Sequence, residues 1–307
     1  MPSNRLRRSE LSTPGSSPKM IAKAAASDAD LVFLDLEDSV VASEKEAARR
    51  NIIDGLNGLD WGKKTRACRI NPVSTQWCHG DLIEVVSGAG ENLDVVIVPK
   101  VFGPRDVWFV EDLLTQLETR LGLEVGRIGL EVLIEETQAL ARVEEIASCS
   151  PRLEALILGV GDLSASQGIR LGHIGAAADG TNGYPGDVWH YARNRMIVAA
   201  RANGLDAVDG PYGAINDPEG YEREASWAAT LGSVGKWAIH PSQIPIANQV
   251  FAPTRTEIER AAAALRAVQE AEDAGLGAAS FQGQMIDAAT ARIFDGVLER
   301  ARLCGIA

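Results

Sequence analysis

Two apolar runs decide the fold: residues 128–135, IGLEVLIE, and residues 153–162, LEALILGVGD. Each run is rich in aliphatic side chains, as buried parallel strands are, and each ends in a carboxylate, Glu135 or Asp162. Neighbouring strands of a parallel barrel end at one rim, where such barrels hold their chemistry. Two carboxylates there suit Mg²⁺, which keeps positions for substrate oxygens and water. The runs therefore predict a metal-assisted enzyme with an oxygen-rich substrate.

Further runs of the same kind bring the number of candidate strands to eight. The candidates are residues 10–13, 31–34, 67–68 with their neighbours, 94–98, 128–134, 153–160, 205–208 and 236–239. Helical periodicity is found between them, at residues 44–56, 107–121, 139–147, 189–203 and 219–231. This alternation predicts an α/β fold, a (β/α)8 TIM barrel. A doubly wound open sheet is the alternative, but it would collect polar residues at one switch point, whereas here they follow nearly every strand.

The pattern changes after Pro253. An alanine-rich helical stretch covers residues 255–274, a glycine-containing hinge covers 275–283, and a last helix is expected at 285–303, with no strand in this tail. We therefore predict two domains. A TIM-barrel catalytic domain covers residues 1–253, and a C-terminal helical arm covers residues 254–307 and packs on the barrel or on a neighbouring subunit.

Length and composition exclude several classes of protein. The 307 residues accommodate one TIM barrel of about 250 residues and an appendage. The net charge of -12 argues against a nucleic-acid partner, and no apolar run reaches the roughly 18 residues of a membrane span. The four cysteines show no CxxC spacing, and the basic N-terminus has no apolar segment behind it, so we expect a cytoplasmic protein.

Polar residues follow almost every candidate strand, which is typical of a catalytic rim. They are Pro14-Gly15, Asp35 to Asp38, Arg69-Ile70-Asn71, Pro99-Lys100, Glu135, Asp162, Asp209-Gly210 and His240-Pro241. Glu135 and Asp162 are the metal candidates. The alternative for this pair is a structural one, as solvated or arginine-paired carboxylates at helix N-termini.

The other rim residues each have two interpretations. Asp35 and Glu37 share a face, and they fit either metal-bound waters or a strand-end turn that caps the next helix. Arg69 fits a fixed cation for a developing enolate or thioester oxygen, and it equally fits an ion pair with one of these carboxylates. For Lys100 the pattern favours a structural ion pair, and for His240 a packed or backbone-bonded histidine.

The clearest basic neighbourhood of this acidic chain surrounds Pro14-Gly15-Ser16-Ser17. Its cations are Arg5, Arg7, Arg8, Lys19 and Lys23. The neighbourhood fits the phosphates of a nucleotide-bearing substrate. A solvated basic terminus is the alternative.

With these positions assembled, the chain resembles the CoA-ester lyases of the HpcH/HpaI aldolase and citrate lyase β-subunit superfamily, most of all the malyl-CoA and β-methylmalyl-CoA lyases. The resemblance spans nearly the whole length. It rests on Pro14-Gly15-Ser16 with Lys23, Leu34 to Val40, Arg69-Ile70-Asn71, Val98-Pro99-Lys100, Ile134-Glu135, Leu158-Gly159 to Asp162, Val208 to Pro211, Gly235 to Pro241 and Gly283 to Asp287.

The resemblance implies a set of site residues. Glu135 and Asp162 would hold Mg²⁺, with Mn²⁺ as the alternative metal. Arg69 would stabilise the enolate of the acyl-CoA, and Asp287 would be the acid/base that the arm carries to an adjacent subunit; Glu37 is counted with these catalytic residues. The positions expected near the CoA thioester are Ser12, Ser17, Lys23, Ile239 and His240. Close relatives have an aromatic residue and an arginine in place of the two serines.

The implied activity is a Mg²⁺-dependent retro-Claisen cleavage. Malyl-CoA or β-methylmalyl-CoA would be split reversibly into glyoxylate and acetyl-CoA or propionyl-CoA. A malyl-CoA thioesterase, a citramalyl-CoA lyase, a CoA-independent metal aldolase and a non-enzymatic barrel are the alternatives. The expected partners are the acyl-CoA, a 2-oxo acid and further copies of the chain, in a homo-oligomer that is a trimer or hexamer, with neither nucleic acid nor a membrane.

Overall fold

Eight parallel strands close into a barrel in the computed structural model, which describes residues 5–170 and 186–306. The strands follow one another in sequence order, and β1 pairs with β8 as well as with β2. They are β1 Ser9–Pro14, β2 Leu31–Asp35, β3 Thr65–Arg69, β4 Val95–Val98, β5 Gly129–Ile134, β6 Leu153–Leu158, β7 Asp206–Asp209 and β8 Gly235–Ala238. The predicted TIM barrel is confirmed, and the open-sheet alternative is wrong.

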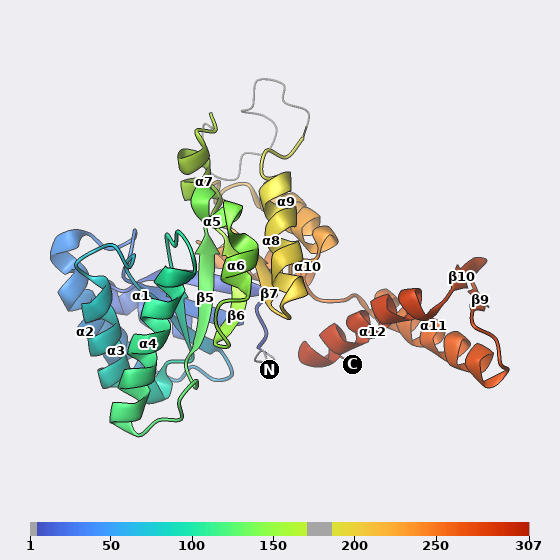
Figure 1. Cartoon of the computed structure of the whole chain (residues 1–307), viewed down its shortest axis with the longest axis horizontal. Helices are drawn as coiled ribbons and strands as arrows, with labels where there is room; N and C mark the ends of the chain where they lie inside the picture. Colours follow the sequence, from blue (N-terminus) through green and yellow to red (C-terminus); the bar gives the residue numbers. More distant parts are fainter. Residues whose placement is uncertain (1–4, 171–185, 307) are drawn as a thin grey trace. The chain divides into compact units, whose positions relative to one another are not determined.

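Helices follow the strands and cover the outside of the barrel, with α2, α3 and α4 side by side (Figure 1). Up to residue 250 they are α1 Pro18–Ala25, α2 Lys45–Gly58, α3 Cys78–Ala89, α4 Pro104–Leu121, α5 Thr137–Ala141, α6 Val143–Ala147, α7 Val160–Gln167, α8 His190–Ala202, α9 Pro218–Leu231 and α10 Ile244–Val250, with 3-10 turns η1 Ala42–Glu44, η2 Gly90–Asn92 and η4 Pro241–Gln243. The single helix expected at 139–147 is two short helices, because Arg142 between them leaves the helical conformation (φ −119°, ψ 22°). No helix in the described part of the chain has the length and apolarity to cross a membrane.

The strands separate two buried apolar layers. Val32 and Leu34 of β2 belong to a layer that also contains helix residues such as Ile52 and Leu114, so this layer fills the space between strands and helices. The side chains that alternate with it form a second cluster of Leu31, Phe33, Ala67, Val95, Ile97, Leu133, Ala155, Ile157, Val208, Val234 and Trp237. This cluster fills the barrel interior. Asp35 and Arg69 have the same parity as the interior residues of their strands and therefore end the interior at its rim.

Charged side chains close the other end of the interior, at the amino ends of the strands. The fully buried Arg7 donates to Glu131 (Nε to Oε1, 2.8 Å) and also bonds to Glu154. Glu10 is fully buried as well and accepts a hydrogen bond from Trp237 Nε1 at 2.8 Å. Burial raises the pKa of Glu10 well above its ordinary value, and the charge of Glu131 raises it further.

Residues 250–306, with residues 5–6, form a second compact unit. Its helices α11 Arg255–Asp273 and α12 Ala288–Leu303 pack on each other, and a hairpin of β9 Ala279–Phe281 and β10 Gln284–Ile286 joins them (Figure 1). The expected strandless tail, with a hinge to Gly283 and a helix from Met285, is therefore wrong. Gln282 (φ 51°) and Gly283 (φ 77°) both have left-handed backbone, the combination that a type I′ hairpin turn requires.

Glu10→Gln tests the buried polar cluster at the amino ends of the strands. Folding holds a proton on Glu10 that the unfolded chain releases above the ordinary pKa of 4.5, so this group makes the free energy of unfolding fall as the pH rises. Glutamine keeps an acceptor for Trp237 and removes the titration. Urea unfolding between about pH 5 and 8 should show a flatter pH dependence in Glu10→Gln, by up to about 1.4 kcal/mol per pH unit. The exposed Glu46→Gln is the control, and equal slopes in the two variants would contradict the prediction.

Candidate active site

Arg69, the last residue of β3, lies at the centre of the rim. Its Nε and NH2 donate to the two oxygens of Asp35, at 2.6 and 2.8 Å, and its NH1 lies 3.0 Å from Glu37. The register of β2 with β3 places Asp35 directly beside Arg69. Asp35 also accepts from the Ser39 hydroxyl at 2.5 Å. Burial alone would raise the pKa of Asp35, but Arg69 and Ser39 hold it below its ordinary value. The ion pair considered for Arg69 is thus present, and it fixes the direction of the guanidinium.

Aromatic rings of the barrel interior lie within cation–π distance of Arg69. Its Cζ is 5.8 Å from the centroid of the Phe33 ring and 5.5 Å from that of Trp237, and the two rings are 4.4 Å apart. Such contacts stabilise a desolvated guanidinium. Burial opposes the charge of Arg69, yet Asp35 raises its pKa above the ordinary value. The rim therefore holds a permanent, oriented cation.

Glu135 follows β5 directly and is buried between two other strand ends. The backbone N–H of Lys100, after β4, donates to its Oε1 at 2.7 Å. On the other side, after β6, Gly159 leaves room for the side chain, since a Cβ at Gly159 would lie 2.4 Å from Glu135 Cβ and 2.6 Å from Oε2. Burial raises the pKa of Glu135 to about 8, with a contribution from the charge of Asp162. The positive charges around Glu135 therefore do not offset the effects that disfavour its ionised form.

Lys100 and Asp162 complete the rim. Asp162 lies in the first turn of α7 with 41% of its side chain exposed. The Nζ of Lys100 is 2.5 Å from Glu37, 3.0 Å from Asp38 and 3.7 Å from Asp162. The structure thus contains the ion pair that the sequence favours for Lys100. The carboxylates around the rim outnumber the two side-chain cations bonded to them, Arg69 and Lys100.

The donor set fits a divalent cation at Glu135 and Asp162. A cation would stabilise the ionised form of Glu135, which burial and the charge of Asp162 disfavour. At Gly159 no side chain occupies the space beside Oε2 of Glu135. The described residues contain no group of three or more His, Cys, Asp or Glu side chains placed to hold a metal. Two protein carboxylates are what Mg²⁺ accepts when water and substrate fill its other positions.

The residues expected near CoA lie in or after β1 and β8, which pair with each other. Ser12 is half-buried in β1, Ser17 is the N-cap of α1, and Lys23 is exposed in the last turn of that helix. Ile239 is 41% exposed, and the exposed His240 caps η4 with its side chain. Ser17 and His240 therefore have local structural roles, and contact of these five residues with CoA stays a prediction.

Asp287 is the N-cap of α12. Its carboxylate accepts hydrogen bonds from the backbone N–H groups of Ala289 and Thr290, both at 3.0 Å, and from the Thr290 hydroxyl at 3.1 Å. The hydrogen bonds from Thr290 lower the pKa of Asp287. Its assignment as the acid/base stays a prediction.

Asp209 was expected at the rim and does not lie there. β7 includes Asp209, and because Val208 before it faces the interior, Asp209 faces the helices. It accepts from Lys236 Nζ at 2.6 Å and from Arg193 Nε at 2.9 Å, in a buried network between strands and helices. Sequence reasoning conversely missed the place of Gly159 against Glu135. The glycine's position at a predicted strand end was the available indication.

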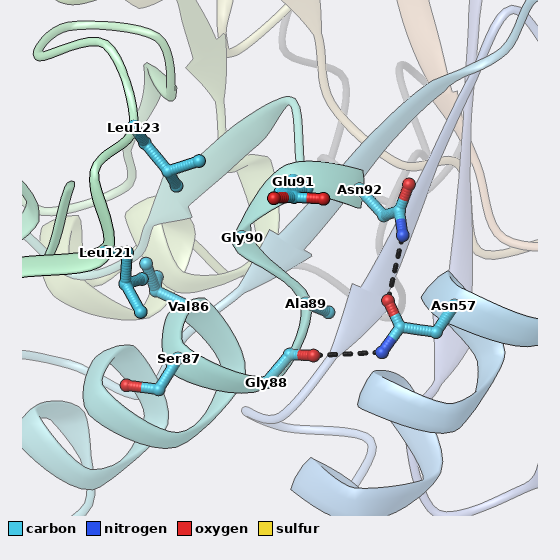
Figure 2. A pocket seen from close by; sticks show the side chains of 10 residues that line it. All are labelled: Asn57, Val86, Ser87, Gly88, Ala89, Gly90, Glu91, Asn92, Leu121 and Leu123. Atoms are coloured by element: carbon cyan, nitrogen blue, oxygen red, sulfur yellow. Dashed lines mark hydrogen bonds between the residues drawn. The ribbon is translucent and has the colours of Figure 1, made fainter.

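A separate hollow of about 180 Å³ lies near the end of α3, just before β4 begins (Figure 2). Asn57 of α2 donates to the carbonyl of Gly88 and accepts from Asn92, both at 2.9 Å. These polar groups satisfy one another. The hollow lies at the amino end of the strands, so it is distinct from the rim.

Comparison with known proteins places this chain in the class of carbon–carbon lyases. A family model described as C-C bond lyase of the TIM-barrel fold matches residues 179–306, and one described as HpcH/HpaI aldolase/citrate lyase matches residues 8–241. The chain belongs to the HpcH/HpaI aldolase/citrate lyase family and is a carbon–carbon lyase. The resemblance noted in the sequence is confirmed.

Individual relatives cover almost the whole chain. The L-malyl-CoA/beta-methylmalyl-CoA lyase of Cereibacter sphaeroides is 40% identical over 98% of this chain and 96% of its own. The malyl-CoA/beta-methylmalyl-CoA/citramalyl-CoA lyase of Chloroflexus aurantiacus is 35% identical over 91% of this chain and 82% of its own. Among solved structures, CitE of Mycobacterium tuberculosis in complex with magnesium, acetoacetate and coenzyme A matches at 30% identity with a TM-score of 0.75, over 98% of this chain and 100% of that one.

Gly159→Ala tests the place of Glu135. The added Cβ would displace Glu135, so we expect Mg²⁺ to bind about tenfold more weakly or worse, because ligand geometry sets its affinity. Isothermal titration calorimetry of Mg²⁺ into the substrate-free protein measures this. Gly58→Ala is the control, since the added Cβ would have no atom within 4 Å apart from its chain neighbours and its own helix backbone. Unchanged Mg²⁺ affinity in a folded Gly159→Ala protein would refute the assignment.

Proposed function

We propose that this protein is a Mg²⁺-dependent CoA-ester lyase that cleaves malyl-CoA or β-methylmalyl-CoA reversibly to glyoxylate and acetyl-CoA or propionyl-CoA. One observation carries the proposal. Glu135, short of positive charge, lies with Asp162 at a rim that also holds the oriented guanidinium of Arg69. The relatives named as malyl-CoA and β-methylmalyl-CoA lyases support the choice of substrate.

Glu135 and Asp162 are the proposed metal ligands. Bound Mg²⁺ would supply Lewis-acid chemistry, lowering the pKa of the substrate hydroxyl and fixing its orientation. Mn²⁺ is the alternative, because it also takes oxygen ligands. The magnesium in the CitE complex supports Mg²⁺ as the metal.

Residues of the chain itself assist the cleavage of the carbon–carbon bond. The hydroxyl gives its proton to the carboxylate of Asp287, the bond between the hydroxyl-bearing carbon and the carbon next to the thioester breaks, and its electron pair passes to the acyl-CoA enolate. Arg69 donates to the enolate oxygen from a direction that Asp35 has already fixed, so little reorganisation is needed. Glu37 holds Arg69 and Lys100 in place. Asp287 returns a proton to the enolate carbon, and the reverse steps give condensation.

The proposal includes the grip on CoA and the assembly. One candidate surface for the CoA thioester is formed by residues in or after the adjacent strands β1 and β8, namely Ser12, Ser17, Lys23, Ile239 and His240. A catalytic domain at residues 1–253 and an arm at 254–307 would form a homo-oligomer, a trimer or hexamer. In it, the arm would bring Asp287 to an adjacent subunit.

The assay that tests the function uses malyl-CoA and Mg²⁺ with the purified protein. Glyoxylate is followed as its phenylhydrazone, and free CoA is followed with a thiol reagent. We expect glyoxylate without free CoA; free CoA with little glyoxylate would instead indicate a thioesterase. If neither product forms, citramalyl-CoA and then CoA-free aldol substrates are tested next.

Asp287→Asn should lower kcat by about 100-fold or more, because general acid–base catalysis contributes that much. Asparagine caps α12 as aspartate does, and Asp295→Asn, exposed on the same helix, is the matched control.

Arg69→Lys tests enolate stabilisation. Lysine keeps the charge and loses the two-nitrogen grip on Asp35. We expect kcat to fall about 100-fold or more, as when one oxyanion donor is removed, with a smaller change in KM. Steady-state kinetics on malyl-CoA measure both. Arg66→Lys, on the same strand and paired with Asp94, is the control, and comparable kcat values in the two variants would exclude the role of Arg69.

A further inference from the structure

Lys100 has an uncommon backbone conformation. Its φ of 48° lies in the left-handed region, and Gln282 in the hairpin turn is the only other non-glycine residue with positive φ among those described. Such a conformation persists where the surrounding structure determines it, and it is concentrated at functional sites. The surroundings of Lys100 are the carboxylates of the rim.

Backbone and side chain of Lys100 bond to different carboxylates. The backbone N–H holds Oε1 of Glu135 at 2.7 Å. The ammonium group donates to Glu37 at 2.5 Å and to both oxygens of Asp38 at 3.0 and 3.2 Å, while Asp162 is 3.7 Å away. One residue therefore divides four of the rim carboxylates into two pairs. Glu37 and Asp38 have the ammonium as a hydrogen-bond partner, and Glu135 and Asp162 do not.

We propose that Lys100 is a positioning residue that limits how many carboxylates a divalent cation meets: its ammonium group retains Glu37 and Asp38 and leaves Glu135 and Asp162 for Mg²⁺. The inference rests on the proposed function of that pair. A cation held by two carboxylates keeps positions for substrate oxygens. Additional carboxylates would raise its affinity and favour Ca²⁺, which accepts more oxygen ligands than Mg²⁺. Lys100 in this way sets both the affinity of the site and its selectivity for Mg²⁺ over Ca²⁺.

Metal titration of Lys100→Gln tests the proposal without any assay of activity. MgCl₂ and CaCl₂ are titrated by calorimetry into the substrate-free wild type, Lys100→Gln and Lys63→Gln. The exposed Lys63 undergoes the same change of charge in the loop before β3. We expect Lys100→Gln to bind Ca²⁺ about tenfold more tightly than the wild type, Mg²⁺ to gain less, and Lys63→Gln to match the wild type. Equal or weaker binding of both ions by Lys100→Gln would overturn the proposal.

Two further measurements make the result specific. Thermal melts establish that the variants are folded, and Lys100→Asn serves if Lys100→Gln is not, because asparagine tolerates positive φ. In a Glu37→Gln background the effect of Lys100→Gln on Ca²⁺ affinity should shrink, since one of the carboxylates it would release is already neutral. If Lys100→Gln raised Ca²⁺ affinity as much in this background as in the wild type, the proposal that Lys100 retains Glu37 would be wrong. A wild type that binds neither ion would refute the proposed function instead, so the two failures are distinguishable.

Discussion

The buried ion pair between Arg69 and Asp35 determines how the rim is arranged. Two charges removed from water are stable together only when their geometry is good and their remaining donors and acceptors are satisfied. Ser39 and Glu37 meet this condition by bonding to Asp35 and to the guanidinium respectively. The pair thereby fixes the turn after β2 together with the end of β3. Removing one partner would leave an uncompensated buried charge, at a cost of about 3–5 kcal/mol.

The interior of the barrel supports this pair from within. Arg69 lies over Phe33 and Trp237, and the indole N–H of Trp237 is bonded to Glu10 at the opposite end of the interior. A closely packed interior leaves side chains few alternative rotamers. The position of the guanidinium thus depends on layers of side chains well below the rim, including a carboxyl group, Glu10, whose raised pKa favours its neutral form.

Local periodicity was sufficient to predict the eight barrel strands, because strands buried on both faces are continuous apolar runs. It was not sufficient for the hairpin of β9 and β10, whose strands of three residues are short and partly exposed. The same method predicted Asp209 at the rim, because it ended the strand at residue 208. Asp209 is the last residue of β7, and its side chain alternates with that of Val208 and faces outward. For the proposed site, strand ends predicted Glu135, Asp162 and Arg69, whereas Asp287 was predicted from family resemblance alone. Its place directly after the three-residue strand β10 carries no periodic pattern.

The surroundings of Glu135 show why its position demands two unlike neighbours. On one side the chain places a lysine in a left-handed conformation that glycine would adopt more easily. On the other side it places a glycine where any side chain would collide with Glu135. Glycine at position 100 would still donate its backbone N–H to Glu135, but it would supply no ammonium group to Glu37 and Asp38. A side chain at position 159 would fill the space that Oε2 needs. The strained backbone therefore belongs to Lys100, whose ammonium group bonds to Glu37 and Asp38. The glycine is at position 159, where the side chain of Glu135 needs the space.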